Sequence, residues 1–553
     1  MADSPKSNPA TSTAPSSPAD ATALRTPSSE VRPAPTPSPP PSPKRTEKTM
    51  TGSMAPIAPK NFGYEQARHL LWRAGFGGTP VQIQTLASWG PTKAVEYVID
   101  PANAPGDRPR ADLFDKNIMR EPSAEERKAY QAARQKQDED ALAKFRVEQQ
   151  RRQGQDRQQI SEVQRWWLKR MIETPRPLEE KMVLFWHGHF ATSYRNIENS
   201  FHMYLQNELF RKNALGNFGD LLYGIIRDPA MLKYLNNDTS RKGKANENLA
   251  REIMELFSLG IGGYTENDIK EGARSLTGYT FKDDTFVFEK NNHDGGVKTI
   301  LGRTGAFDGD GFVKIILEQQ GVSRFITRKL YHNFCAELPP LERADYSDLP
   351  GPQQAALRDL ASTFASSKYE LKPVLRRLFL SQHFYDDKVM NEQIKGPTQL
   401  VVGAVRSLDT PVRDLSILND ALDLMGQNLL FPPSVKGWDG GRSWINTSTM
   451  FVRQNIMAFL LTGKKPRGYD ANADEMKYDP MPLLAEMAKA NPGSEKDPAA
   501  VADYLLRLTI GTAPQQSKEA LASLSAKVGG GVSRELVIGY LLLITAMPEY
   551  QLC

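Results

Sequence analysis

The sequence predicts a mainly α-helical protein: a large multi-helix globular domain with one small β-hairpin, preceded by a disordered Pro/Ser-rich tail. Three observations lead to this prediction. Apolar residues recur at spacings of three and four in segment after segment, which is the period of a helix with one buried face. Only 279–290 has the aromatic, turn-interrupted pattern of a β-hairpin. The length of 553 residues suits one large helical domain with extensions, or two to three average domains.

Residues 1–58 form the predicted tail. They are rich in Pro, Ser, Thr and Ala, with PAPTPSPPPSP at the centre. Such a segment buries too little apolar area to offset the entropy of ordering it, so we expect disorder with polyproline character. The helical domain then occupies 59–553. Within it, about 122–161 is rich in Glu, Lys, Arg, Gln and Ala and lacks an apolar stripe, which predicts a charged helical insertion that is solvated or mobile.

The charge and the apolar pattern argue against two classes of partner. The net charge of +5 comes from 70 basic and 65 acidic residues and is nearly balanced, and no long basic block is present, so we expect no nucleic-acid partner. No apolar run reaches the roughly 18 residues of a membrane-spanning helix, so we expect no transmembrane segment. The N-terminus lacks the charged and apolar regions of a secretory signal, which predicts a cytoplasmic protein as written.

The cysteine count limits the possible metal chemistry. Only Cys335 and Cys553 are present, so one chain cannot form a disulfide framework or a cysteine-based zinc site. A transition-metal site would therefore have to draw on carboxylates and on the seven histidines, which are His69, His187, His189, His202, His293, His332 and His383.

The strongest candidate for a functional site lies midway along the chain. Asn248, Glu252 and Glu255 share one stripe of a predicted helix, beside its apolar stripe. Two carboxylates one turn apart on a half-buried face repel each other unless a cation, a proton or hydrogen-bond donors satisfy them. Arg251 and Arg274 are nearby candidates for that role. The pair is therefore either part of a structural arginine–carboxylate network or a chemical site.

A His-Asp pair follows the predicted hairpin. His293 and Asp294 lie in a glycine-rich turn, where a neighbouring carboxylate can fix the tautomer of an imidazole for catalysis or metal binding. The same pair can equally form an Asx-type turn with a solvated imidazole. Thr265 and Asp268, by contrast, have the spacing of a variant capping box and predict only the start of a helix.

His189 is the third candidate. It shares one face of a predicted helix with Met182 and Trp186, so its neighbours are apolar. Such a histidine is either a core residue whose ring bonds a backbone carbonyl or a ligand directed at the carboxylates.

An irregular segment, 426–446, forms the second informative cluster. Its Pro-Pro, Gly-Trp and Gly-Gly pairs forbid a regular helix and predict a rigid loop that presents Trp438 and Trp444. Tryptophans in such a loop can stack on sugar rings or other rigid ligands. The alternative is a loop that plugs the helical core.

Taken together, these segments resemble the bacterial domain-of-unknown-function 1800 family. The matching motifs are HLLWRAGFG, EKMVLFWHGHFATS, NENLAREIMELFSLG with YTENDIKEGARSLTGYTF, HDGGVKTILG and FPPSVKGWDGGRSWIN. They stand in family order from about residue 62 to the end. The resemblance implies a mostly helical fold without an established reaction. It also implies an exported or periplasmic location and a sulfatase-like protein encoded nearby as partner, although this chain lacks a signal peptide and carries the charged insertion.

Two functions remain open at this point. We expect a non-catalytic or structural module that binds a partner protein or polymer at the cell envelope. The alternative is a metal-assisted hydrolase or related enzyme, in which Zn, Mn or Fe activates a water. Its candidate catalytic residues are His189, Glu252, Glu255, His293 and Asp294. Its metal ligands would be His189, Glu252 and His293, and its ligand-binding residues Trp438, Trp444, Arg251 and Arg274.

Overall fold

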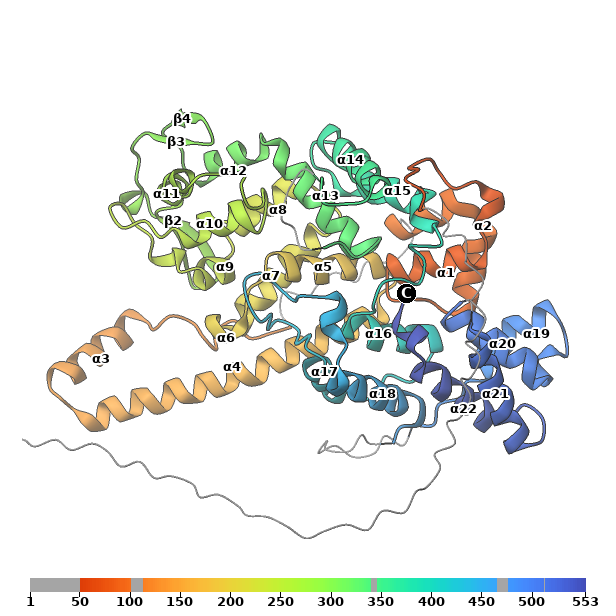
Figure 1. The fold of residues 1–553 in the computed structure, drawn as a ribbon. Coiled ribbons are helices and arrows are strands. Elements are labelled where there is room, and N and C mark those ends of the chain that lie inside the picture. Colours follow the sequence, from red (N-terminus) through yellow and green to blue (C-terminus); the bar gives the residue numbers. More distant parts are fainter. Residues whose placement is uncertain (1–49, 101–112, 340–345, 465–475, 512) are drawn as a thin grey trace, which may run out of the picture. The chain divides into compact units, whose positions relative to one another are not determined.

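Helices account for nearly all of the regular structure, which confirms the predicted fold class (Figure 1). The computed structural model describes residues 50–100, 113–339, 346–464, 476–511 and 513–553. In the first part of the chain the helices are α1 (Tyr64–Arg73), α2 (Pro80–Ile99), α3 (Ala124–Gln135), α4 (Glu139–Glu173), α5 (Pro177–His189), α6 (Tyr194–Ile197), α7 (Ser200–Lys212), α8 (Phe218–Ile225) and α9 (Pro229–Tyr234).

The middle of the chain contains both helices and strands. Its helices are α10 (Asn248–Glu255), α11 (Glu266–Ser275), α12 (Gly309–Leu317), α13 (Gln320–Phe334), α14 (Gly351–Ser366) and α15 (Leu371–Leu380). The predicted capping box at the start of α11 is confirmed, because Thr265 accepts from the Asp268 amide and Asp268 accepts in return.

The predicted hairpin is present, and a second one follows it. Strands β1 (Tyr279–Lys282) and β2 (Thr285–Phe288) pair antiparallel, with Tyr279 opposite Phe288. Strands β3 (Lys298–Ile300) and β4 (Arg303–Gly305) form another antiparallel pair. The sequence did not predict this second pair because strands of three residues are too short to show alternation.

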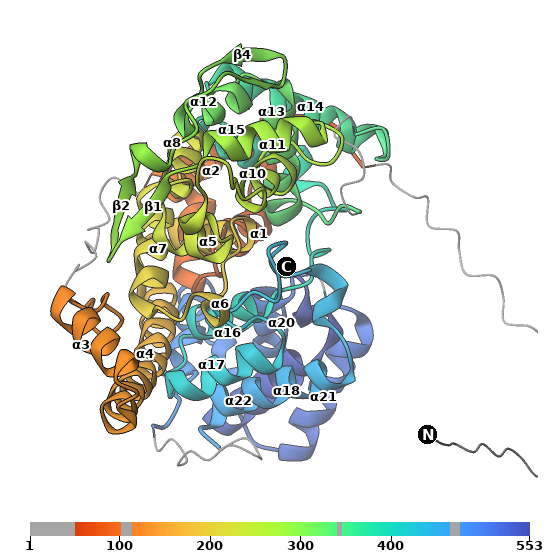
Figure 2. The same ribbon diagram turned by 90° about the vertical axis from the view of Figure 1, so that its left-hand side faces the viewer.

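The last third of the chain is helical. It contains α16 (Pro397–Leu408), α17 (Leu415–Leu424), α18 (Thr447–Thr462), α19 (Ala485–Ala490), α20 (Pro498–Thr509), α21 (Gln515–Val528) and α22 (Arg534–Ala546). Helix α18 packs against α16, α17 and α22, and these helices lie together in both views (Figures 1 and 2).

Ordered structure begins earlier than the predicted boundary at residue 59. Met54 and Ile57 are buried, and the Ile57 amide donates to the Leu380 carbonyl at 2.8 Å. These two apolar side chains pack into the hydrophobic core near the end of α15. Their burial orders this segment although it follows a Pro/Ser-rich stretch. The predicted disorder of residues 1–49 lies outside the described residues.

The charged segment forms two helices. Helix α3 packs against the first half of α4, where the Tyr130 and Phe145 rings meet edge-on at 5.4 Å. Most side chains of this pair are exposed up to residue 155. From Asp156 onward α4 enters the core, because Asp156 is buried and accepts a hydrogen bond from Tyr194 at 2.8 Å.

Helix α5 is fixed at its start by two buried charges. Glu180 accepts from Arg211 of α7 at 2.6 Å, from Arg170 of α4 at 2.6 Å and from the Trp167 indole at 3.0 Å. The Lys181 ammonium donates to the carbonyl oxygens of Trp72, in the last turn of α1, and of Gly75, just after that helix. The Glu180 charge is therefore compensated by two arginines, the Lys181 ammonium is hydrogen-bonded to neutral carbonyls, and α5 is tied to three other helices.

The other end of α5 meets the 426–446 loop almost backbone to backbone. Gly437 has a φ of 84°, and a Cβ placed on it would lie 2.1 Å from the Gly188 carbonyl oxygen. A Cβ on Gly188 would lie 3.6 Å from a carbon of the Trp438 ring. Only glycine fits at 437, both for its left-handed backbone and for the contact.

This contact makes a first prediction. Gly437→Ala should lower the free energy of unfolding in urea by about 1–2 kcal/mol from the left-handed backbone and by about 1–3 kcal/mol more from the clash. Gly243→Ala is the matched control, because Gly243 has a φ of 77° and nothing within 4 Å of its Cβ position. Equal losses in the two variants would show that the loop does not depend on the contact.

A second prediction concerns His187 of α5. Burial and then Arg211 lower the pKa of this imidazole to about 3, and its Nε2 accepts from Asn207 at 2.9 Å. The unfolded chain therefore takes up this proton first, and the stability that His187 contributes is lost as pH falls from about 6.5 towards 3. In urea unfolding, the difference between wild type and His187→Gln should shrink by on the order of 1 kcal/mol per pH unit in this window. A pH-independent difference would contradict the buried neutral imidazole.

Candidate functional site

Glu252 and Glu255 share a half-buried face of α10, as predicted. Burial and then the like charge of Glu255 raise the pKa of Glu252, and the nearby cations Arg251 and Lys436 oppose this. Glu255 accepts a hydrogen bond of 2.5 Å from the Tyr264 hydroxyl. Lys436 belongs to the 426–446 loop, so Glu252 is within range of a charge on that loop.

The two candidate arginines are committed to other carboxylates. Arg251 donates to both oxygens of Glu266 at 2.8 Å. It precedes Glu252 by one residue, so its side chain leaves α10 about 100° away from that of Glu252. Arg274 donates to Asp294 and to Glu271, each at 2.8 Å. Arginine–carboxylate networks therefore exist, but the ion pairs of Arg251 and Arg274 are formed with Glu247, Glu266, Glu271 and Asp294 and not with Glu252.

His293 and Asp294 form a structural turn. The His293 Nδ1–H donates to the Thr277 carbonyl at 2.9 Å, and Asp294 accepts from the amide of Gly296 as in an Asx-type turn. The hydrogen bond from Arg274 lowers the pKa of Asp294 to about 2. Each group has a structural partner, which corresponds to the second of the two interpretations.

His189 lies at the end of α5 and is 3% exposed. Its Nε2 lies 3.0 Å from the Phe257 carbonyl oxygen, which can only accept, so Nε2 carries the proton. Burial and the charge of Lys329 hold its pKa well below the ordinary value, so the ring is neutral. The remaining Nδ1 offers a lone pair that has no hydrogen-bond partner among the described residues.

The three predicted metal ligands are His189, Glu252 and His293. Within the described ranges, no group of three His, Cys, Asp or Glu side chains could hold a metal ion. His189 Nε2 and His293 Nδ1 are each turned to a backbone carbonyl, at Phe257 and Thr277. Each of the two predicted histidine ligands thus has one ring nitrogen bound to a backbone carbonyl.

A polar stripe on α13 faces the same place and was missed by the sequence analysis. Lys329 is close enough to His189 for its charge to lower the pKa of that imidazole, His332 and Asn333 follow on α13, and Glu337 lies just after the helix. The Lys329 Nζ lies 5.4 Å from the Phe325 ring, and burial lowers its pKa to about 8. His332 accepts from the Leu338 amide at 3.0 Å, and burial followed by Lys329 lowers its pKa to about 4.

The α13 side contacts α5, α5 contacts the 426–446 loop, and the loop contacts the α13 side again, so the three segments form a closed circuit of contacts. Phe325 packs against His189 with ring centroids 6.2 Å apart. At the other end of the stripe, a Cβ on Gly441 would lie 3.0 Å from the Glu337 carboxylate. Trp438, three residues earlier in the loop, packs on Gly188 next to His189. We call the polar members of this circuit the polar ring; they are His189, Lys329, Asn333, Glu337 and Trp438.

Four atoms of the polar ring are buried without a hydrogen-bond partner among the described residues: His189 Nδ1, Asn333 Nδ2, Glu337 Oε1 and Trp438 Nε1. Buried polar atoms normally have partners, so such a group calls for water or a ligand. Apart from His189, every side chain of the ring keeps part of its surface exposed. The ring is thus accessible from outside. The local sign of it in the sequence was the helical spacing of three polar residues, Lys329, His332 and Asn333, which puts them on one face.

The two loop tryptophans have different roles. Trp444 is 7% exposed and packs near Gly426 and Gly396, so it plugs the core. Trp438 is partly exposed and belongs to the polar ring. Of the two predicted ligand-binding tryptophans, Trp438 is the one that a ligand can reach.

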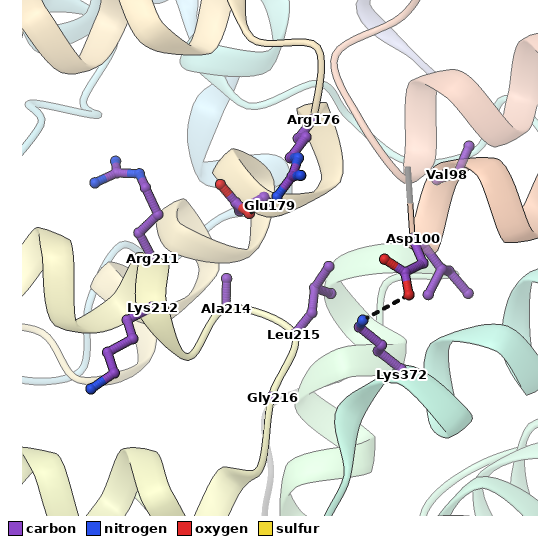
Figure 3. Close-up of a pocket in the computed structure, with 11 residues that line it drawn as sticks. Val98, Asp100, Arg176, Glu179, Arg211, Lys212, Ala214, Leu215, Gly216 and Lys372 are labelled. Carbon is purple, nitrogen blue, oxygen red and sulfur yellow. Dashed lines mark hydrogen bonds and ion pairs between the residues drawn. The ribbon is translucent and has the colours of Figure 1, made fainter. Parts of the chain in front are cut away.

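A pocket of about 250 Å³ lies elsewhere, between the ends of α2 and α7 and the starts of α5 and α15 (Figure 3). Its lining includes Arg176, Glu179 and Lys212, and the Lys372 ammonium pairs with Asp100 at 3.2 Å across its edge. None of the sequence-predicted site residues lines it. Its lining holds more cations than anions, and most of them are paired: Lys372 with Asp100, Arg176 with Glu179, and Arg211 with Glu180 and Glu208.

Comparison with known proteins places the chain in one family. No helix in the described part of the chain is long and apolar enough to cross a membrane. No curated protein and no solved structure matches the sequence. A family model described as a protein of unknown function, DUF1800, matches residues 69–552, which is nearly the whole helical domain. The chain therefore belongs to the DUF1800 family.

Proposed function

We propose that the protein is a non-catalytic binding module that holds a hydroxyl-rich polymer at the polar ring. The observation that carries this proposal is the set of four unpartnered atoms. Two of them, on Asn333 and Trp438, are donors, and two, on His189 and Glu337, are acceptors. Hydroxyl groups of a saccharide both donate and accept, and could satisfy all four.

The partly exposed Trp438 supports a saccharide over a protein partner. A stable protein interface buries about 800 Å² on each partner and centres on apolar anchors. The unpartnered atoms of the ring are instead recessed and polar, so small groups such as hydroxyls reach them more easily than another protein surface does. An aromatic face beside them offers the apolar side of a sugar ring a place to stack. The cell envelope as location and a sulfatase-like partner rest on the family resemblance alone.

Binding is favoured over hydrolysis because the candidate catalytic groups do not form a working set. A general base must lie within hydrogen-bond reach of a nucleophile or a water that faces the substrate. His293 and Asp294 are held in their turn, and the outward nitrogen of His189 is an acceptor without a carboxylate behind it. The remaining pair, Glu252 and Glu255, lies on α10, where Glu255 accepts from the Tyr264 hydroxyl.

Trp438→Ala tests the proposal. Sedimentation with insoluble polysaccharides and affinity electrophoresis with dextran, polygalacturonate and chitosan should show that wild type is retained by at least one of them. Loss of the indole should weaken that retention by roughly tenfold or more, as expected for a buried aromatic anchor. Trp89→Ala is the matched control, because Trp89 is also partly exposed but lies on α2. Absence of retention on every polymer, or equal losses in both variants, would refute the proposal.

Metal content separates this proposal from the hydrolase alternative. If Glu252 ligated Zn, Mn or Fe, elemental analysis of the purified protein would find one of these metals in stoichiometric amount, and Glu252→Gln would remove it. The binding module predicts the same metal content in wild type and in Glu252→Gln, with both proteins folded by circular dichroism. A stoichiometric metal that is lost only in the variant would favour the hydrolase.

A further inference from the structure

We infer that the ligand carries a carboxylate and that Lys329 binds it, which makes the polymer an acidic, uronate-type polysaccharide. This inference rests on the proposed function and specifies its ligand. Lys329 supplies the only cation of the polar ring as defined above. The other members of the ring supply neutral hydrogen-bonding groups and one carboxylate.

The surroundings of Lys329 are short of negative charge. Its imidazole neighbours, His189 and His332, are both neutral, since burial lowers the pKa of each. Its helix neighbour Arg328 is a further cation that pairs with Asp348 at 3.1 Å. The Lys329 Nζ has no hydrogen bond or ion pair with any described residue, and burial is the only cause of its lowered pKa. The Lys329 side chain is half-buried and its ammonium has no acceptor on the described residues, so an anion placed beside it gains a charge-assisted hydrogen bond.

The donors around Lys329 favour a carboxylate over a cation or a dianion. Asn333 Nδ2 and Trp438 Nε1 are free donors on the same ring, so they can support the oxygens of an anion. A metal cation would meet the Lys329 charge instead of a ligand set. A phosphate or sulfate dianion needs several donors of positive charge, as arginine clusters or a lysine with backbone amides supply, whereas Lys329 is the one cation of the polar ring.

The acceptors indicate what surrounds the carboxylate. His189 cannot turn its proton towards the ring, because Nε2–H is bonded to the Phe257 carbonyl, so Nδ1 must receive a hydrogen bond. Glu337 Oε1 also requires a donor. Hydroxyls next to a sugar carboxylate supply such donors. A fatty acid or another apolar carboxylate would leave both acceptors unsatisfied, which is costly in a buried site.

A thermodynamic cycle tests the inference by changing the ligand carboxylate to a methyl ester and Lys329 to methionine. Isothermal titration calorimetry would measure binding of an oligogalacturonate and of its methyl ester to wild type, Lys329→Met and Lys314→Met. Lys314 is an exposed lysine of α12 and serves as the control. Wild type should bind the ester roughly tenfold or more weakly than the acid. Lys329→Met should bind the acid more weakly than wild type does, by a similar factor in affinity. The two losses should not add, because both remove one ion pair.

The outcomes separate this inference from the proposed function. If wild type binds acid and ester equally, and Trp438→Ala weakens both, the saccharide module stands and the role of Lys329 is refuted. Additive losses in the cycle, or an equal effect of Lys314→Met, would also refute it. If neither oligosaccharide binds while a neutral polymer is retained through Trp438, the carboxylate is refuted alone. If no saccharide is retained at all, both fall.

Discussion

The structure depends on the way in which α5 is held at both ends. At its start, Glu180 and Lys181 carry opposite charges into the core, and each is satisfied by groups from other helices. Removing one partner from such a buried pair leaves an uncompensated charge, which is far more destabilising than losing an exposed ion pair. The position of α5 relative to α1, α4 and α7 is therefore fixed by a few strong interactions and not only by apolar packing.

This anchoring determines what the last turn of α5 can present. Gly188 allows the loop backbone to approach at Gly437, and His189 binds the Phe257 carbonyl that follows α10. Three segments far apart in the sequence thus meet within one turn of helix. The polar ring forms where they meet because α13 packs along the same side through Phe325. The loop also contacts Glu337, just after α13, through Gly441, so it is held from two sides.

Local patterns predicted the helices, the first hairpin and the capping box of α11, because each depends on neighbours within a few residues. The half-buried carboxylate stripe of α10 was predicted for the same reason. The partners of these groups could not be predicted. That Glu252 lies near Lys436, while Arg251 turns to Glu266, follows from how α10 packs against the loop. Lys329 was passed over because a lysine on an amphipathic helix gives no local sign that other elements will enclose it.

The hydrogen-bond partners of the lysine ammonium groups distinguish the polar ring from the rest of the core. Among the described lysines whose pKa is lowered with burial as the main cause, Lys181, Lys298 and Lys395 each donate to backbone carbonyls. Lys329 has no such acceptor. The fold therefore supplies oxygens to buried ammonium groups wherever they serve packing alone. An ammonium left without them, in a ring whose four other side chains have unpartnered atoms, is what a binding site requires when the missing oxygens come from the ligand.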